Sequence, residues 1–169
     1  MGDRPLPFVQ VACLCEHVLV ENDNVASAIR IVDTFNISTV ELAAIQLGAG
    51  VPIDMDAAKK AAYQLIPVRA WLLLSLKAST AQAEPYNGEI RSYNTEGELK
   101  STAEIEFRLD SEDAGATVVL NVTLLAEKEG RHHLDIVVDG QLLTRIPYRI
   151  NLVEDQAEPP ATGKAVNES

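Results

Sequence analysis

The chain has 169 residues, of which 47% are hydrophobic, so it is long enough and apolar enough to fold around a core of its own. Its 25 acidic and 14 basic residues give a net charge of −11. We therefore expect neither nucleic acids nor membranes as partners, because phosphate groups are bound by clusters of lysine and arginine.

Several features of the sequence predict a cytoplasmic protein. The N-terminal residues lack the basic and apolar regions of a secretory signal. No segment approaches the roughly 20 apolar residues that a membrane span needs. Cys13 and Cys15 are the two cysteines, and we expect both to be reduced thiols.

The first third of the chain predicts a hairpin followed by an excursion. Apolar and β-branched residues predict a strand over Phe8–Val20 and a second strand over Ala28–Phe35 that pairs back on the first. Residues 36–66 contain several glycines and Pro52, so we expect an irregular connection there. Within it, good helix formers predict one short helix over Ala57–Leu65.

Strands joined by polar turns continue from residue 68 onward. The predicted strands are Val68–Ala78, Glu89–Tyr93, Ala103–Leu109, Thr117–Ala126, His132–Val138 and Gln141–Leu152. The Asp139-Gly140 dipeptide predicts a tight turn between the last two. Pro147 has no N–H group to donate, so we expect an edge strand at that point.

About eight strands and one short helical excursion predict an all-β protein, an antiparallel β-sandwich over residues 1–153. Residues 154–169 contain two adjacent prolines and almost no large apolar residue, and they are predicted to form a disordered acidic tail.

Several of these segments also carry a family resemblance. They are Ala12–His17, Arg30–Phe35, Val68–Lys77, His133–Gly140 and Arg145–Ile150. Their pattern resembles a bacterial family of small proteins that is known only as a domain of unknown function. The resemblance implies an immunoglobulin-like β-sandwich, and it brings no catalytic residues with it.

Cys13, Cys15 and His17 occupy alternate positions of the first predicted strand, so they project from one face. Thiolate and imidazole are ligands that zinc prefers. However, three such residues spread over roughly 13 Å of extended chain, too wide for one ion without a bend. Val9 and Val11 share the face, and small cysteines are common in cores. We therefore expect core packing, with a metal site as the alternative.

His132 and His133 are adjacent, so on a strand they point to opposite faces and only one can join a given site. His133 shares a face with Asp135, whose carboxylate could orient the imidazole. We expect a solvent-facing pair of histidines beside a turn, with an acid–base or metal-ligand pair as the alternative.

The residues Asp110–Asp113 form an acidic loop of the kind that can bind calcium. Asp54 and Asp56 are the other acidic pair available to such a site. An acidic loop on an acidic protein is more often solvated, which is what we expect here. Trp71 could line a ligand surface, but we expect it to anchor the core.

Because we find no catalytic motif, we expect a non-enzymatic interaction or accessory module that needs no cofactor. Its expected partner is a protein, and self-association through an edge strand is included in this expectation. One alternative is a metal-binding protein or metal-dependent enzyme that uses Cys13, Cys15 and His17, or His133 and Asp135. A second alternative is a calcium- or carbohydrate-binding sandwich.

Overall fold

The computed structural model describes residues 4–22, 25–38, 66–126 and 128–153. Every regular element in these ranges is a β-strand, so the prediction of an all-β protein is confirmed. None of these segments contains a helix that is long and apolar enough to cross a membrane. The strands are β1 (Phe8–Val20), β2 (Ala26–Ile31), β3 (Thr34–Ser38), β4 (Ile66–Lys77), β5 (Tyr86–Tyr93), β6 (Leu99–Phe107), β7 (Gly115–Ala126), β8 (Gly130–Val138) and β9 (Gln141–Val153).

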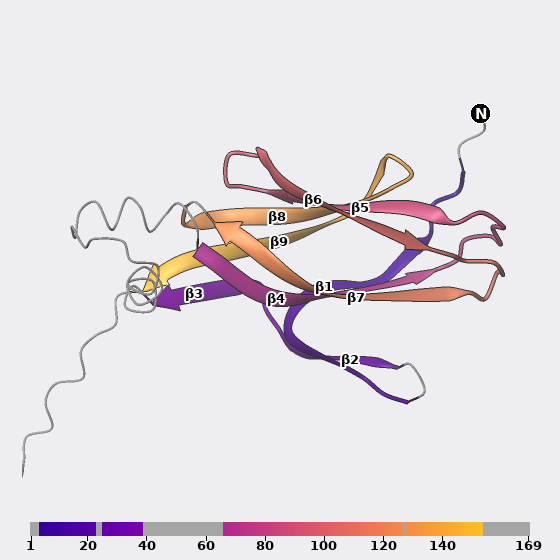
Figure 1. The fold of residues 1–169 in the computed structure, drawn as a ribbon, viewed down its shortest axis with the longest axis horizontal. Helices are drawn as coiled ribbons and strands as arrows, with labels where there is room; N and C mark the ends of the chain where they lie inside the picture. Colours follow the sequence, from indigo (N-terminus) through magenta and orange to yellow (C-terminus); the bar gives the residue numbers. More distant parts are fainter. Residues whose placement is uncertain (1–3, 23–24, 39–65, 127, 154–169) are drawn as a thin grey trace, which may run out of the picture.

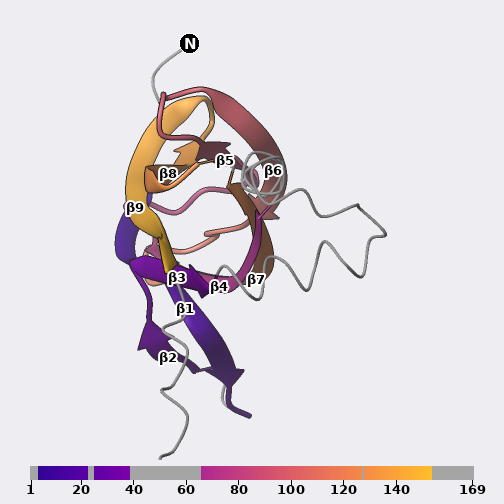
Figure 2. The ribbon, with the colours of Figure 1, turned by 90° about the vertical axis from the view of Figure 1, so that its left-hand side faces the viewer.

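The strands form two sheets that lie face to face (Figure 1). One sheet has the order β2-β1-β4-β7, and the other has the order β3-β9-β8-β5-β6. Neighbouring strands are antiparallel, except that β3 and β9 run parallel. Figure 2 shows the two layers from one end, and in both views the β1–β2 hairpin extends away from them.

The hydrophobic core lies between the inner faces of the two sheets. Leu72, Leu74 and Leu76 alternate along β4 and are fully buried. Ile136 and Ile150 of the opposing sheet belong to the same cluster. Burial of each such side chain contributes about 1.5–3 kcal/mol. Because β1 and β7 flank β4 on its two sides, β4 supplies the centre of its sheet.

The predicted single strand Ala28–Phe35 is in fact two strands that lie in different sheets. β2 pairs with β1 as the predicted hairpin, whereas β3 pairs with β9 at the edge of the other sheet. The change of sheet follows Arg30, whose φ of 54° lies in the left-handed region. The carbonyl of Asp33 then accepts a hydrogen bond from the N–H of Arg149 at 2.7 Å, which fixes the chain beside β9.

β9 is an edge strand over only part of its length. β3 pairs with it from Arg149 onward, and the Arg149 N–H is directed toward β3. N–H groups two positions apart on a strand point to the same side. The missing N–H of Pro147 therefore faces the side that β3 leaves open. Among the described residues the prediction of an edge at Pro147 is confirmed, and β3 covers the strand beyond it.

The segments predicted outside the strands have mixed outcomes. The Asp139-Gly140 turn is confirmed, with φ angles of 47° and 80°. Of the predicted excursion 36–66, residues 36–38 belong to β3 and residue 66 begins β4. The predicted helix over Ala57–Leu65 and the predicted tail 154–169 lie outside the described residues.

Candidate interaction surfaces

β7 forms one edge of the four-stranded sheet. In the part of the chain that the structure describes, only β4 pairs with it, and their register is unbroken along all twelve residues. The ladder continues beyond the strands, where the Ala78 N–H donates to the Ala114 carbonyl at 2.9 Å. Even-numbered residues of β7 therefore bond to β4, and odd-numbered residues direct their N–H and C=O groups outward. The outward groups include those of Thr117, Val119, Asn121 and Thr123.

The other edge strands of the described structure carry features that discourage pairing. β2 has six residues and includes the left-handed Arg30, and β3 has only five residues. β6 carries Lys100, Glu104 and Glu106. Short strands, charged side chains and backbone irregularities are the devices by which natural proteins protect sheet edges. β7 has none of them, because it is long, regular and free of charged residues and proline.

The inner face of β7 is incompletely covered. Val118, Leu120 and Val122 point toward the core and pack against it, but each is only half-buried. Leu72 and Leu74, their neighbours on β4, are fully buried. A strand added beside β7 would cover these apolar side chains as well as the outward backbone groups.

The β1–β2 hairpin presents a second apolar surface. Leu19, Ile29 and Ile31 lie on one face of it, and their exposed fractions are 55%, 39% and 69%. Exposed apolar residues that gather on one surface are typical of interaction sites. Arg30 lies between Ile29 and Ile31 in the sequence. Its side chain lies on the opposite face of the hairpin, where it forms an exposed ion pair with Glu16 at 3.2 Å.

Cys13 and Cys15 are buried, but not in the core between the sheets. The register places them opposite Leu73 and Trp71 on the outer face of the four-stranded sheet, whereas Leu14 between them faces the core. Trp71 is half-buried on this outer face, so the prediction that it anchors the core is wrong.

The sequence predicts that Val9 and Val11 share one face of the strand with Cys13 and Cys15. A register shift between Val9 and Val11 makes this wrong, because it places the two valines on opposite faces. Val9 packs against the core, whereas Val11 is 40% exposed on the other side of the strand. His17 is exposed, so it does not pack in the core either. Burial raises the pKa of the Cys13 and Cys15 thiols, which lowers the fraction of thiolate that a metal could bind.

His132 is a core residue, and the prediction of a solvent-facing histidine is wrong for it. Its side chain is nearly inaccessible and stacks on Tyr148, with the ring centroids 5.4 Å apart. Its Nε2 lies 2.9 Å from the carbonyl oxygen of Lys128. The sequence does contain a signal for this position, because His132 alternates in phase with the core residues Leu134 and Ile136.

His133 lies on the opposite face, half-buried, and stacks on Tyr93 with the ring centroids 4.8 Å apart. It shares this face with Asp135 as predicted, but its Nε2 is 3.9 Å from the nearer carboxylate oxygen. Arg145 instead donates to both oxygens of Asp135, at 2.7 and 2.8 Å. These hydrogen bonds hold the pKa of Asp135 below its ordinary value, and burial together with Arg145 lowers the pKa of His133.

The acidic loop Asp110–Asp113 is exposed to solvent. Lys77 donates from Nζ to the backbone carbonyl of Asp113 at 2.7 Å, so a cation of the protein already contacts this loop. Asp54 and Asp56 lie outside the described residues. Among the residues that are described, no group of three or more histidine, cysteine, aspartate or glutamate side chains is placed to hold a metal ion.

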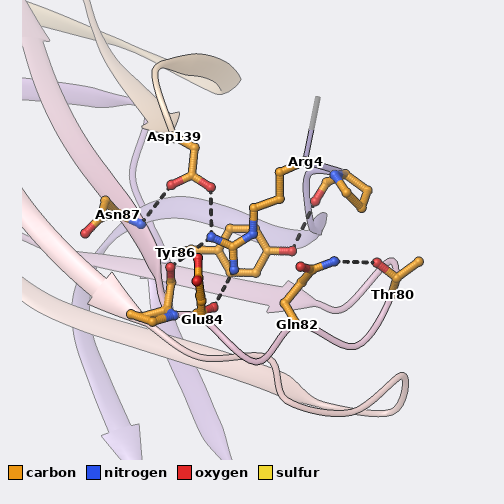
Figure 3. Close-up of polar contacts among 9 residues, drawn as sticks. Arg4, Thr80, Gln82, Glu84, Tyr86, Asn87 and Asp139 are labelled. Carbon is orange, nitrogen blue, oxygen red and sulfur yellow. Dashed lines mark hydrogen bonds and ion pairs between the residues drawn. The ribbon is translucent and has the colours of Figure 1, made fainter. Parts of the chain in front are cut away.

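Arg4 ties the N-terminal segment to the start of β5 and to the turn between β8 and β9 (Figure 3). Its Nη1 donates to the Pro85 carbonyl at 2.9 Å and to the Asp139 carboxylate at 3.2 Å, and its Nη2 donates to the Glu84 carbonyl. The guanidinium carbon lies 3.7 Å from the centre of the buried Tyr86 ring. Sequence reasoning missed this site, because no local pattern links residues so far apart in the chain.

No protein-family model matches the chain, and no curated protein matches it in sequence. Two similar solved structures are those of β-glucosidase 3B from Thermotoga neapolitana, one in complex with glucose and one with glycerol. Each is 10% identical with a TM-score of 0.39, and the match covers 50% of this chain and 15% of that chain.

Proposed function

We propose that this protein is a non-enzymatic interaction module that binds another polypeptide by strand addition at β7. The observation that carries the proposal is the regular, uncharged edge of β7, which directs the backbone groups of alternate residues outward. In strand addition, main-chain hydrogen bonds supply affinity and side chains at alternate positions supply specificity.

Two kinds of interaction favour an added strand. Each new backbone hydrogen bond contributes about 0.5–1.5 kcal/mol after the loss of bonds to water. The half-buried Val118, Leu120 and Val122 would also lose contact with water, which contributes about 25 cal/mol per Å² of apolar surface. The β1–β2 hairpin is less suited to this mode of binding, because Arg30 interrupts its outer strand.

The proposal includes three finer assignments. Two facing, largely antiparallel sheets of four and five strands support an immunoglobulin-like type of sandwich. The fold is also compatible with the bacterial family of unknown function that the sequence resembles. Two cysteines with no disulfide between them support a cytoplasmic location.

The metal-dependent alternative draws less support from the described residues. Both oxygens of Asp135 are engaged by Arg145, which leaves His133 without a free carboxylate beside it. Cys13 and Cys15 are buried on the outer face of a sheet, and their raised pKa values disfavour the thiolate form.

The proposal can be tested by site-specific photo-crosslinking in the native host. A photoreactive residue in place of Asn121, which is exposed on β7, should give one discrete protein adduct. The matched control replaces Glu104, which is exposed on the charged edge strand β6, and should give no discrete adduct. Equal crosslinking at the two positions, or none at position 121, would contradict binding at β7.

A further inference from the structure

We infer that the strand added at β7 is β7 of a second copy of this chain, running antiparallel about a twofold axis. This inference rests on the proposed function and names its partner. The two four-stranded sheets would then join into one continuous sheet of eight strands. Such pairing uses the same surface on both copies, which is the commonest arrangement in homodimers.

The charge of the chain favours this edge for self-association. Each copy carries a net charge of −11, so two copies repel one another over most of their surfaces. β7 contains no charged residue, whereas β6 would bring Glu104 and Glu106 against a second copy. Like charges that face each other across paired strands are destabilising.

The sequence of β7 is complementary to itself in the antiparallel direction. With Leu120 opposite Leu120 of the second copy, Val118 lies opposite Val122 and Thr117 lies opposite Thr123. In this register the outward backbone groups of Val119 face those of Asn121, so the hydrogen-bonding positions of the two strands coincide. The half-buried apolar residues of each copy would also cover those of the other.

Charged residues of both signs flank the two ends of β7, which Glu127, Lys128 and Glu129 follow directly. Arg69 is exposed on β4 next to Thr123, and the exposed Glu112 and Asp113 lie just before the other end of β7. Antiparallel pairing turns the Arg69 end of one copy toward the acidic end of the other. A pairing of this kind stops at two copies, because each chain has one β7 and the joined sheet ends in β2 on both sides.

The experiment compares the association state of the full chain with that of two pairs of variants by analytical ultracentrifugation. The wild-type chain should sediment as a dimer that dissociates on dilution. Asn121→Pro removes an outward N–H that β4 does not use, so it should be a folded monomer. Asn121→Ala keeps that N–H and should remain a dimer.

A charge-swap pair tests the register and does not depend on a proline. The Thr117→Lys/Thr123→Lys variant places lysines opposite each other in the proposed dimer and should weaken it by roughly tenfold. The corresponding Thr117→Glu/Thr123→Glu variant should be weakened in the same way. Mixing the two variants should restore a heterodimer, because each lysine then faces a glutamate.

The outcomes separate this inference from the proposed function. A wild-type chain that stays monomeric while position 121 crosslinks to a different protein would overturn the second-copy inference and leave strand addition standing. A dimer that persists in folded Asn121→Pro, or that mixing the charge variants does not restore, would also overturn it. A monomer with no adduct at position 121 would contradict both.

Discussion

Arg145 on β9 lies opposite Asp135 on β8 and donates hydrogen bonds to both oxygens of its carboxylate, at 2.7 and 2.8 Å. This two-point geometry is the strongest arrangement that an arginine and a carboxylate can form. Asp135 is therefore already paired, although it lies on the same face as His133. A pattern that looks like an acid–base pair in the sequence is an ion pair that stabilises the sheet.

Removal of Arg145 should destabilise the fold. In Arg145→Met, the buried Asp135 carboxylate loses both hydrogen bonds, and we expect a loss of about 1–3 kcal/mol in the free energy of unfolding. The loss should lie toward the lower end, because Arg145 itself is half exposed and water screens its charge. Urea unfolding measures the change. Arg149→Met, at an exposed position of the same strand, serves as the control, and an equal loss there would contradict the role of the pair.

His133 should make stability depend on pH near neutrality. Burial and Arg145 lower its pKa in the folded chain, with Asp135 opposing, so the unfolded chain binds a proton more readily. Stability should therefore fall as the pH drops below about 6.5, the ordinary pKa of histidine, and it should keep falling until the pH reaches the lower pKa that His133 has in the folded chain. Melting temperatures of the wild type and of His133→Phe measure this contribution, because phenylalanine can stack on Tyr93 but cannot ionise. The difference between the two should change between pH 7.5 and 5.5 and stay constant above pH 7.5. A constant difference throughout would argue against this role.

Arg4 should hold the N-terminal segment in place. Arg4→Met removes the contact with Tyr86, the ion pair with Asp139 and two hydrogen bonds to carbonyl groups, at a cost of about 1–3 kcal/mol. Amide hydrogen exchange at Leu6 and Phe8 should become faster. Arg4→Lys keeps the charge but not the planar fork, so its effect should be intermediate. Unchanged exchange in Arg4→Met would show that the segment is held by other contacts.

Cys13 and Cys15 should react slowly with thiol reagents in the folded protein. Burial both limits access and raises the pKa of the two thiols, so little thiolate forms at neutral pH. A chromogenic disulfide reagent should label the two thiols slowly in native buffer. It should label both rapidly once denaturant has unfolded the chain. Rapid labelling of the native chain would show that this outer face opens readily.

Arg30→Gly should stabilise the protein by about 0.5–1 kcal/mol, because glycine adopts the φ of 54° at Arg30 without steric strain. The exposed ion pair with Glu16 contributes little, so its loss should not cancel the gain. Arg30→Ala loses the pair and keeps the strain, and it should not be stabilised. Thermal melting measures both variants, and equal melting temperatures would contradict the strain argument.

The alternation of apolar and polar residues predicts most of the strands, but it does not predict which strands pair with each other. Ile105, Phe107 and Leu109 alternate with charged residues. As expected, they are the covered residues of β6 and of the loop that follows it. The same rule misplaced Cys13, because one extra residue near Val9 reverses the faces of a strand.

Long-range pairings have no local signature. The parallel contact of β3 with β9 joins residues more than one hundred positions apart, and nothing within either segment specifies the other. The edge position of β7 in the described part of the structure is a partial exception. Its uncharged, regular sequence is visible in the chain, but its position at the end of a sheet is known only from the strand order.

The tie between Arg4 and Asp139 also bears on how the protein is made. Asp139, one of the partners of Arg4, belongs to the last hairpin, and β3 finds its partner in β9. A growing chain on the ribosome therefore cannot complete either contact until almost the whole domain has been synthesised. Until then, β3 has no strand to pair with, so the parallel edge of the five-stranded sheet is among the last parts of the fold to form.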